Sequence, residues 1–141
     1  MRRSRSSVLT MDALYAAREA VVLAHVAAEN AHDLDAVMAT FAHPRYEIIP
    51  TGAVHDGVDA VRAMLVEQWH QLPGLRYEAA DIYHAAGGVA VETRTTGTAP
   101  DGRAVDVVSV NVFGFDGPDL VVERCYFDRL TIADALGYTP G

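Results

Sequence analysis

The chain changes its periodicity at Pro73 and Gly74, and this change constrains the fold more than any other feature of the sequence. After it, residues follow the two-residue period of β-strands, and the turn sequences GlyGly, ProAspGly and AspGlyPro interrupt the pattern. Consecutive strands joined by such short turns predict an antiparallel meander. Its four strands are expected at Leu75–His84, Val89–Thr98, Arg103–Asp116 and Leu120–Leu130.

The residues before this point have the pattern of helices, apart from one brief strand expected at Tyr46–Pro50. Apolar residues recur at helical spacing, and Asp33 and Asp56 stand where helix caps are expected. Helices are therefore predicted at residues 12–31, 33–42 and 56–72. Helices first and strands later indicate an α+β fold. Three N-terminal helices can cover one face of a curved antiparallel β-sheet, which produces a cone with a mouth.

The length and the net charge limit the classes of function that the chain can have. The 141 residues suit one domain, expected at residues 12–138 after a disordered tail at 1–11. The net charge of −8 argues against nucleic acid and anionic membranes as partners, and no apolar run reaches the roughly 18 residues of a membrane span. Cys125 is the single cysteine, so neither a disulfide framework nor a cysteine-based metal site is expected. A cytoplasmic location is the default expectation.

Several segments resemble a known family. Residues 25–42 (HVAAENAHDLDAVMATFA) are similar to the N-x-x-D-L-D-x-x-x-x-x-F-A signature of the NTF2-like superfamily, which includes the SnoaL-like polyketide cyclases and the ketosteroid isomerases. Residues 56–61, 123–128 and 136–138 resemble the start of its third helix, its last strand and its tail. The resemblance covers about residues 12–138. It implies the cone-shaped NTF2-like fold with an internal pocket for a small molecule, but not one particular reaction.

The strand expected at residues 103–116 has two faces that both avoid water. Ser109, Asn111 and Phe113 share one face, and three valines at positions 108, 110 and 112 share the other. We expect the first face to line the pocket and the valine face to form a homodimer. The alternative is that the C-terminal tail folds over the valines.

The resemblance also suggests which residues act. Aligned with ketosteroid isomerases, the tyrosine donor falls on His25, the catalytic carboxylate on Ile49 and the second donor on Asn111. Because Ile49 cannot accept a proton, a standard ketosteroid isomerase is not expected. Limonene epoxide hydrolases are also a poor match, because Cys125 replaces an aspartate of their last strand.

The remaining candidates for acid–base work are His25, Asn111 and Asp128. The alternative for His25 is a partly buried side chain that bonds a backbone carbonyl, and for Asn111 an internal network with His25. Asp128 alternatively caps the closing segment or pairs with an arginine. Glu47 is expected at the surface, since it would reach the pocket only if the strand register shifted by one residue.

The pocket wall is expected to include Tyr15, Trp69, Ser109, Phe113 and Tyr126, and its aromatic rings, together with Tyr83, suit a flat ring system. No metal-ligand spacing and no glycine-rich phosphate loop is present, so no metal and no cofactor is expected. The predicted function is a cofactor-independent cyclisation, isomerisation or dehydration of a small hydrophobic carbonyl compound. Two alternatives remain: a non-catalytic module that binds or carries a hydrophobic ligand, and a structural dimer with a filled pocket.

Overall fold

A computed structural model describes residues 10–136 of the chain. Helix α1 spans Met11–Asn30 and begins at Thr10, whose hydroxyl accepts a hydrogen bond from the Ala13 amide at 3.1 Å. Helix α2 spans Leu34–Ala39 and has the predicted cap, since the Asp33 carboxylate accepts from the Ala36 amide at 3.0 Å. Helix α3 spans Val58–Gln71.

The predicted cap of α3 is wrong. Asp56 is the last residue of a strand, and its carboxylate binds Arg45 and His43 instead of the helix terminus. Gly57 occupies the cap position with a φ of 92°, a conformation that glycine adopts without steric cost.

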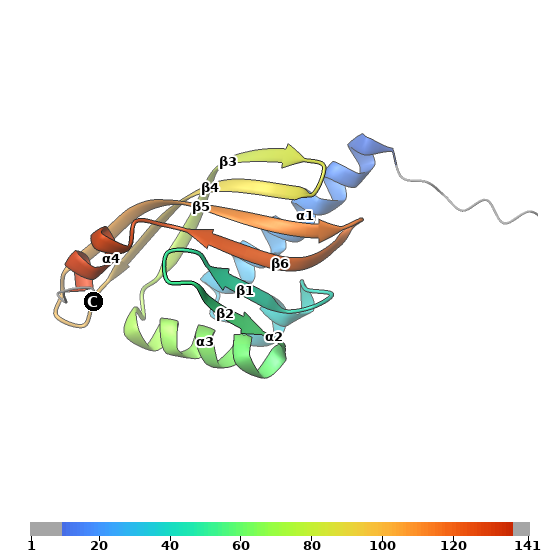
Figure 1. The fold of residues 1–141 in the computed structure, drawn as a ribbon. Coiled ribbons are helices and arrows are strands. Elements are labelled where there is room, and N and C mark those ends of the chain that lie inside the picture. Colours follow the sequence, from blue (N-terminus) through green and yellow to red (C-terminus); the bar gives the residue numbers. More distant parts are fainter. Residues whose placement is uncertain (1–9, 137–141) are drawn as a thin grey trace, which may run out of the picture.

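Six strands form one curved sheet (Figure 1). Their bounds are β1 Arg45–Ile48, β2 Ala53–Asp56, β3 Arg76–Ala85, β4 Gly88–Thr98, β5 Ala104–Asp116 and β6 Asp119–Tyr126. The order is β2-β1-β6-β5-β4-β3, so β3 to β6 form the predicted antiparallel meander. The sheet is not wholly antiparallel, because β1 pairs in parallel with β6. Strand β2 and a fourth helix, α4 at Arg129–Leu136, were not predicted as separate elements.

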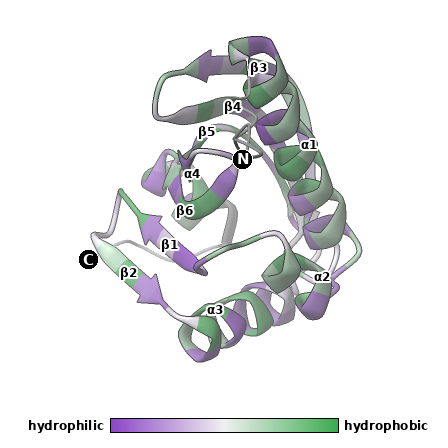
Figure 2. Cartoon of the chain, turned by 90° about the vertical axis from the view of Figure 1, so that its right-hand side faces the viewer, coloured by the Kyte–Doolittle hydropathy of each residue, from purple (hydrophilic) through white to green (hydrophobic). Residues whose placement is uncertain are grey.

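The helices and the sheet enclose an interior, seen end-on in Figure 2. Helix α1 lies beside the β3 side of the sheet, and α3 lies beside β2. The main core consists of buried apolar side chains from both layers, among them Val22, Val61, Leu65, Val91 and Phe113. The α+β fold with helices against a curved sheet is therefore as expected. No helix within the described residues combines the length and the apolar character needed to cross a membrane.

Asn30 joins the end of α1 to the edge strand β3. Its side-chain amide donates to the Tyr77 carbonyl at 2.9 Å, and its side-chain oxygen accepts from the Tyr77 amide at 2.7 Å. The asparagine thus takes the place of a neighbouring strand at this point of the edge. This pair of bonds gives the first residue of the quoted family signature a structural role.

Candidate functional site

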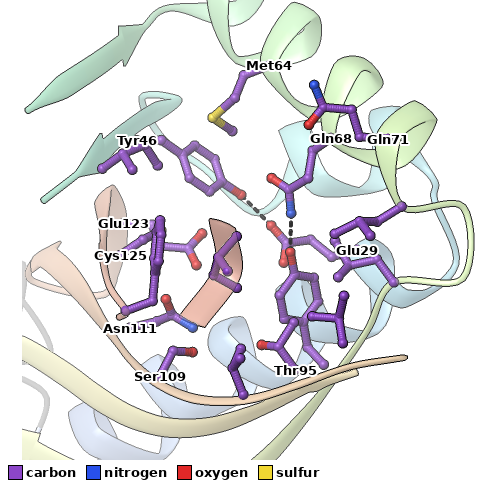
Figure 3. Close-up of a pocket in the computed structure, with 18 of the residues that line it drawn as sticks. Glu29, Tyr46, Met64, Gln68, Gln71, Thr95, Ser109, Asn111, Glu123 and Cys125 are labelled. Atoms are coloured by element: carbon purple, nitrogen blue, oxygen red, sulfur yellow. Dashed lines mark hydrogen bonds between the residues drawn. The ribbon is translucent and has the colours of Figure 1, made fainter. Parts of the chain in front are cut away.

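A cavity of about 340 Å³ lies between α3, the end of α1 and the inner face of the sheet (Figure 3). Its apolar wall consists of Ile48, Met64, Leu72, Leu75, Val105, Val107, Cys125, Phe127 and Ile132. Its polar wall consists of Glu29, Tyr46, Glu67, Gln68, Gln71, Tyr77, Thr95, Ser109, Asn111 and Glu123. Two of these residues, Glu67 and Gln71 on α3, are exposed, so the cavity reaches solvent beside this helix.

The inner end of the cavity holds a cluster of His25, Glu29, Tyr46 and Glu123. His25 Nε2 lies 2.9 Å from Glu123 Oε2, 3.2 Å from Glu29 Oε1 and 2.9 Å from the Tyr46 hydroxyl. The Tyr46 hydroxyl donates to Glu29 Oε1 at 2.6 Å. All four side chains are buried, although three of them also line the cavity.

Local structure brings these four residues together. His25 and Glu29 are one turn apart on α1 and therefore share a face of the helix. Tyr46 on β1 and Glu123 on β6 are register partners in the parallel pair. The cluster therefore depends on β1 lying beside β6, which is a long-range pairing rather than a local motif.

His25 carries a positive charge in this environment. Thr40 Oγ1 donates to the Val37 carbonyl at 2.6 Å, so it can only accept at its 2.8 Å contact with His25 Nδ1. Nδ1 therefore bears a hydrogen, and Nε2 donates towards two carboxylates. Burial on its own lowers the pKa of His25, but the charges and hydrogen bonds of Glu29 and Glu123 outweigh it and raise the pKa from 6.5 to about 10.

Three neighbouring groups, Glu123, Tyr46 and Cys125, also have raised pKa values. Burial, and next the Glu29 charge, raise the pKa of Glu123, while the contacts with His25 and Tyr46 oppose this shift. Burial together with the Glu123 and Glu29 charges raises the pKa of the Tyr46 hydroxyl well above its ordinary value. The Cys125 thiol is shifted upward for the same reasons, so this pKa disfavours the thiolate that a nucleophile needs.

The strands β4 and β5 supply neutral polar groups to the same cavity. Asn111 Nδ2 donates to Thr93 Oγ1 at 3.2 Å. Ser109, two residues earlier on β5, lines the same wall of the cavity. Asn111 is the register partner of Cys125, two residues from Glu123 on β6. Its amide therefore lies on the same sheet face as the Glu123 carboxylate, as Figure 3 shows.

The structure separates the three predicted catalytic residues. Asn111 lines the cavity, but it bonds Thr93 and not His25, so the expected internal network between them is not formed. His25 does not line the cavity; it lies behind Glu29 and Glu123 and bonds side chains, not a backbone carbonyl.

Asp128 does not reach the cavity either. It is exposed and accepts from the Leu130 amide at 2.9 Å and from the Thr131 hydroxyl at 2.8 Å, so it caps α4. A carboxylate is stabilising at this position because the first amide N–H groups of a helix have no acceptor within the helix. The predicted cap is thus the role that the structure shows for Asp128.

Among the five expected wall residues, the structure places Ser109 alone at the cavity. Tyr15 stacks on His84 and Trp69 stacks on His32, each with ring centroids 4.6 Å apart. Phe113 is buried edge-on against His25, and Tyr126 is 41% exposed. These four aromatic residues follow the strand and helix patterns but point into the core or away from the cavity.

Three of the four residues in the buried cluster, Glu29, Tyr46 and Glu123, were not predicted as site residues. Glu29 could have been found from its four-residue spacing to His25, but the other two required the β1–β6 pairing. Ile49 is 40% exposed and Glu47 pairs with Arg45, so β1 contributes no carboxylate to the cavity. One ligand atom each from His25, Glu29 and Glu123 lies within 4.8 Å of the others, a donor set that could hold a metal ion despite lacking a sequence motif.

Comparisons with known proteins agree on the fold. A putative SnoaL-like polyketide cyclase from a Jannaschia species has 20% identity and a TM-score of 0.78, over 99% of this chain and 100% of that one. A second such putative cyclase, from Shewanella denitrificans, has 14% identity and a TM-score of 0.71, over 85% and 96%. A hypothetical protein with a ketosteroid isomerase-like fold from Catenulispora acidiphila, in complex with trimethylamine, has 17% identity and a TM-score of 0.74, over 84% and 93%.

No curated protein sequence matches the chain. The family model of the SnoaL-like domain matches residues 22–124, which is more than half of the 141 residues. This match includes α2, α3, the first five strands and most of β6. The chain belongs to the SnoaL-like domain family.

Proposed function

We propose that the cavity binds a small, mainly apolar carbonyl compound and moves a proton on it without a cofactor. The observation that carries this proposal is the pair of carboxylates, Glu29 and Glu123, on the wall of an otherwise largely apolar cavity. Carboxylates buried beside a largely apolar cavity are a common arrangement for general acid–base catalysis. Two of the named relatives are putative polyketide cyclases, which supports the same class of chemistry.

Glu123 is the proposed base. Burial raises the pKa of Glu123, which makes its carboxylate a stronger proton acceptor than that of an exposed glutamate. It takes a proton from the carbon next to the carbonyl group, the electron pair moves onto the carbonyl oxygen, and the enolate is formed. In a β,γ-unsaturated ketone the enolate is conjugated with the double bond, so return of the proton to the γ-carbon moves the double bond to the α,β position and completes an isomerisation with all atoms conserved.

The developing oxyanion needs neutral donors. Asn111 Nδ2 on β5 carries two hydrogens, of which Thr93 Oγ1 accepts one, so the other can be donated to the oxyanion. One such donor in a dry site contributes about two to three orders of magnitude in rate. His25 is a positioning residue, since it contacts Glu29 and Glu123 from behind the cavity wall.

The test uses hydrogen exchange on simple ketones. β-Tetralone, indanone and cyclohexanone are incubated with the protein in D2O, and loss of the α-proton signals is followed by proton NMR. Wild-type protein is expected to accelerate exchange saturably for at least one ketone. Glu123→Gln should slow it by about 100-fold, in line with the usual contribution of a general base.

Glu67→Gln is the matched control, because Glu67 lines the cavity at its exposed side and does not belong to the buried cluster. This variant should stay within about twofold of the wild type. Binding of the ketones without any exchange would contradict the proposed chemistry and indicate a binding module.

A further inference from the structure

The charges on the cavity wall all have one sign. Its charged residues within the described part of the chain are Glu29, Glu67 and Glu123, and no lysine, arginine or histidine lines it. An anionic ligand such as a carboxylate or phosphate would meet no cationic partner there. Since a buried unpaired charge is costly, the cavity disfavours anions.

The buried cluster also lacks one positive charge. Glu29 and Glu123 both contact Nε2 of a single imidazolium, and Tyr46 brings no charge. Two carboxylate groups face a single imidazolium, so one negative charge at the inner end of the cavity has no cationic partner within the cluster. One more proton or one cation from outside would neutralise it.

We propose that this cavity selects apolar amines, bound as ammonium ions with the charged nitrogen at Glu123 and the hydrocarbon skeleton against the apolar wall. The ammonium group donates hydrogen bonds to the carboxylate, where it replaces the missing positive charge. The Asn111 side chain, on the same sheet face, offers its amide oxygen as a second acceptor. Met64 and Val107 belong to the apolar surface that receives the skeleton.

The inference goes beyond the proposed function but uses the same carboxylate: an ammonium ion bound at Glu123 occupies the proposed base, so amines should compete with ketones for the cavity. It does not depend on proton transfer, because ligand selectivity is measured by binding alone. A protein could therefore prefer amines and still fail to exchange the α-protons of a ketone, and the opposite result is equally distinguishable.

The experiment compares ligands with one skeleton and three charges. β-Aminotetralin, β-tetralol and the corresponding β-carboxylate are titrated into the full chain by isothermal calorimetry at pH 7. The amine should bind at least tenfold more tightly than the alcohol, and the carboxylate should show no measurable binding. Equal affinity for amine and alcohol, or tighter binding of the carboxylate, would overturn the proposal.

Two isosteric variants test which carboxylate causes the preference for the amine over the alcohol. Glu123→Gln should reduce the advantage of the amine over the alcohol to less than about threefold, whereas Glu47→Gln, at a carboxylate that pairs with Arg45 outside the cavity, should keep it. An unchanged advantage in Glu123→Gln would overturn the assignment to this carboxylate. Because the ligand series on wild-type protein already tests the selectivity, the proposal remains falsifiable if Glu123→Gln does not fold.

A divalent metal is the competing occupant, since His25, Glu29 and Glu123 form a possible donor set. Zn²⁺ is therefore titrated in the presence and absence of β-aminotetralin. We expect no stoichiometric Zn²⁺ binding at micromolar concentration. Tight Zn²⁺ binding that excludes the amine and is lost in His25→Ala would establish a metal centre and overturn the proposal.

Discussion

His25 shows how a side chain's charge is determined by its contacts. The residue is fully buried, a position that usually favours the neutral imidazole. Two carboxylates at hydrogen-bonding distance reverse this preference. Its identity as a notable residue was predictable from the sequence because it interrupts an alanine-rich helix. Its role was not, because the partners that set its charge come from β1 and β6.

This charge predicts a pH dependence of stability. The pKa of His25 is about 10 in the folded chain and about 6.5 when unfolded, so between these values the folded state keeps a proton that the unfolded state releases. The contribution is complete below pH 6.5 and is lost as the pH rises towards 10. The free energy of unfolding should therefore fall between pH 7 and 8.5, by up to about 1.4 kcal/mol per pH unit from this group. Urea titrations at several pH values measure it.

Glu123, whose pKa is also raised, changes the free energy of unfolding in the same direction, beginning at its unfolded pKa of about 4.5. The pKa values of Tyr46 and Cys125 are also raised in the folded state, so these groups would add their own pH dependence at higher pH. The measurement is therefore limited to pH 7–8.5. His43→Gln, at an exposed position, serves as the control and should retain the slope. An unfolding free energy that rises or stays constant across this window would show that His25 is not protonated.

Among the helices and strands, those with a local sequence pattern could be predicted, whereas the pairing of strands that are distant in the chain could not. The meander β3 to β6 and the helices α1 to α3 follow from periodicity, turn residues and helix breakers in short windows. Strand β2 has only four residues, and its partner β1 joins the sheet beside β6, far along the chain. A short stretch of sequence carries no signal for such a pairing, so the sequence did not predict that Tyr46 and Glu123 belong to the site.

Asp128 gives a prediction at this scale. Replacing it with alanine removes the acceptor for the first amides of α4 and should lower the free energy of unfolding by about 1 kcal/mol. Thermal or urea denaturation measures the loss. Asp134→Ala, at an exposed position further along the same helix, should have a smaller effect. If Asp128→Ala instead kept full stability and abolished ketone exchange, Asp128 would be a catalytic residue after all.

For the whole molecule, the outer sheet face raises the question of assembly. Val108 is 71% exposed and Val110 37% exposed, and Tyr126 stands opposite Val110 on β6. The face is not wholly apolar, since Arg94 and Asp106 form an ion pair beside the valines. Helix α4 packs at the other side, where Ile132 meets the cavity, so it does not cover them. The tail beyond residue 136 lies outside the described residues.

We propose that two copies of the chain associate through this face. Sedimentation equilibrium at micromolar concentration should give the mass of a dimer. Val110→Glu should yield monomers, because association would bury an unpaired charge. Val66→Glu is the matched control at an exposed position of α3 and should leave the dimer intact. A monomeric wild type would mean that the exposed valines have no partner of this kind.

The central claim is that a carboxylate inside the cavity performs chemistry and does more than bind. Affinity for β-tetralone and the rate of α-proton exchange, measured side by side on Glu123→Gln, test it most directly. We predict an affinity within about twofold of the wild type and an exchange rate lower by about 100-fold, because the base acts in the transition state. Proportional losses in affinity and rate, or exchange at the wild-type rate, would contradict the claim.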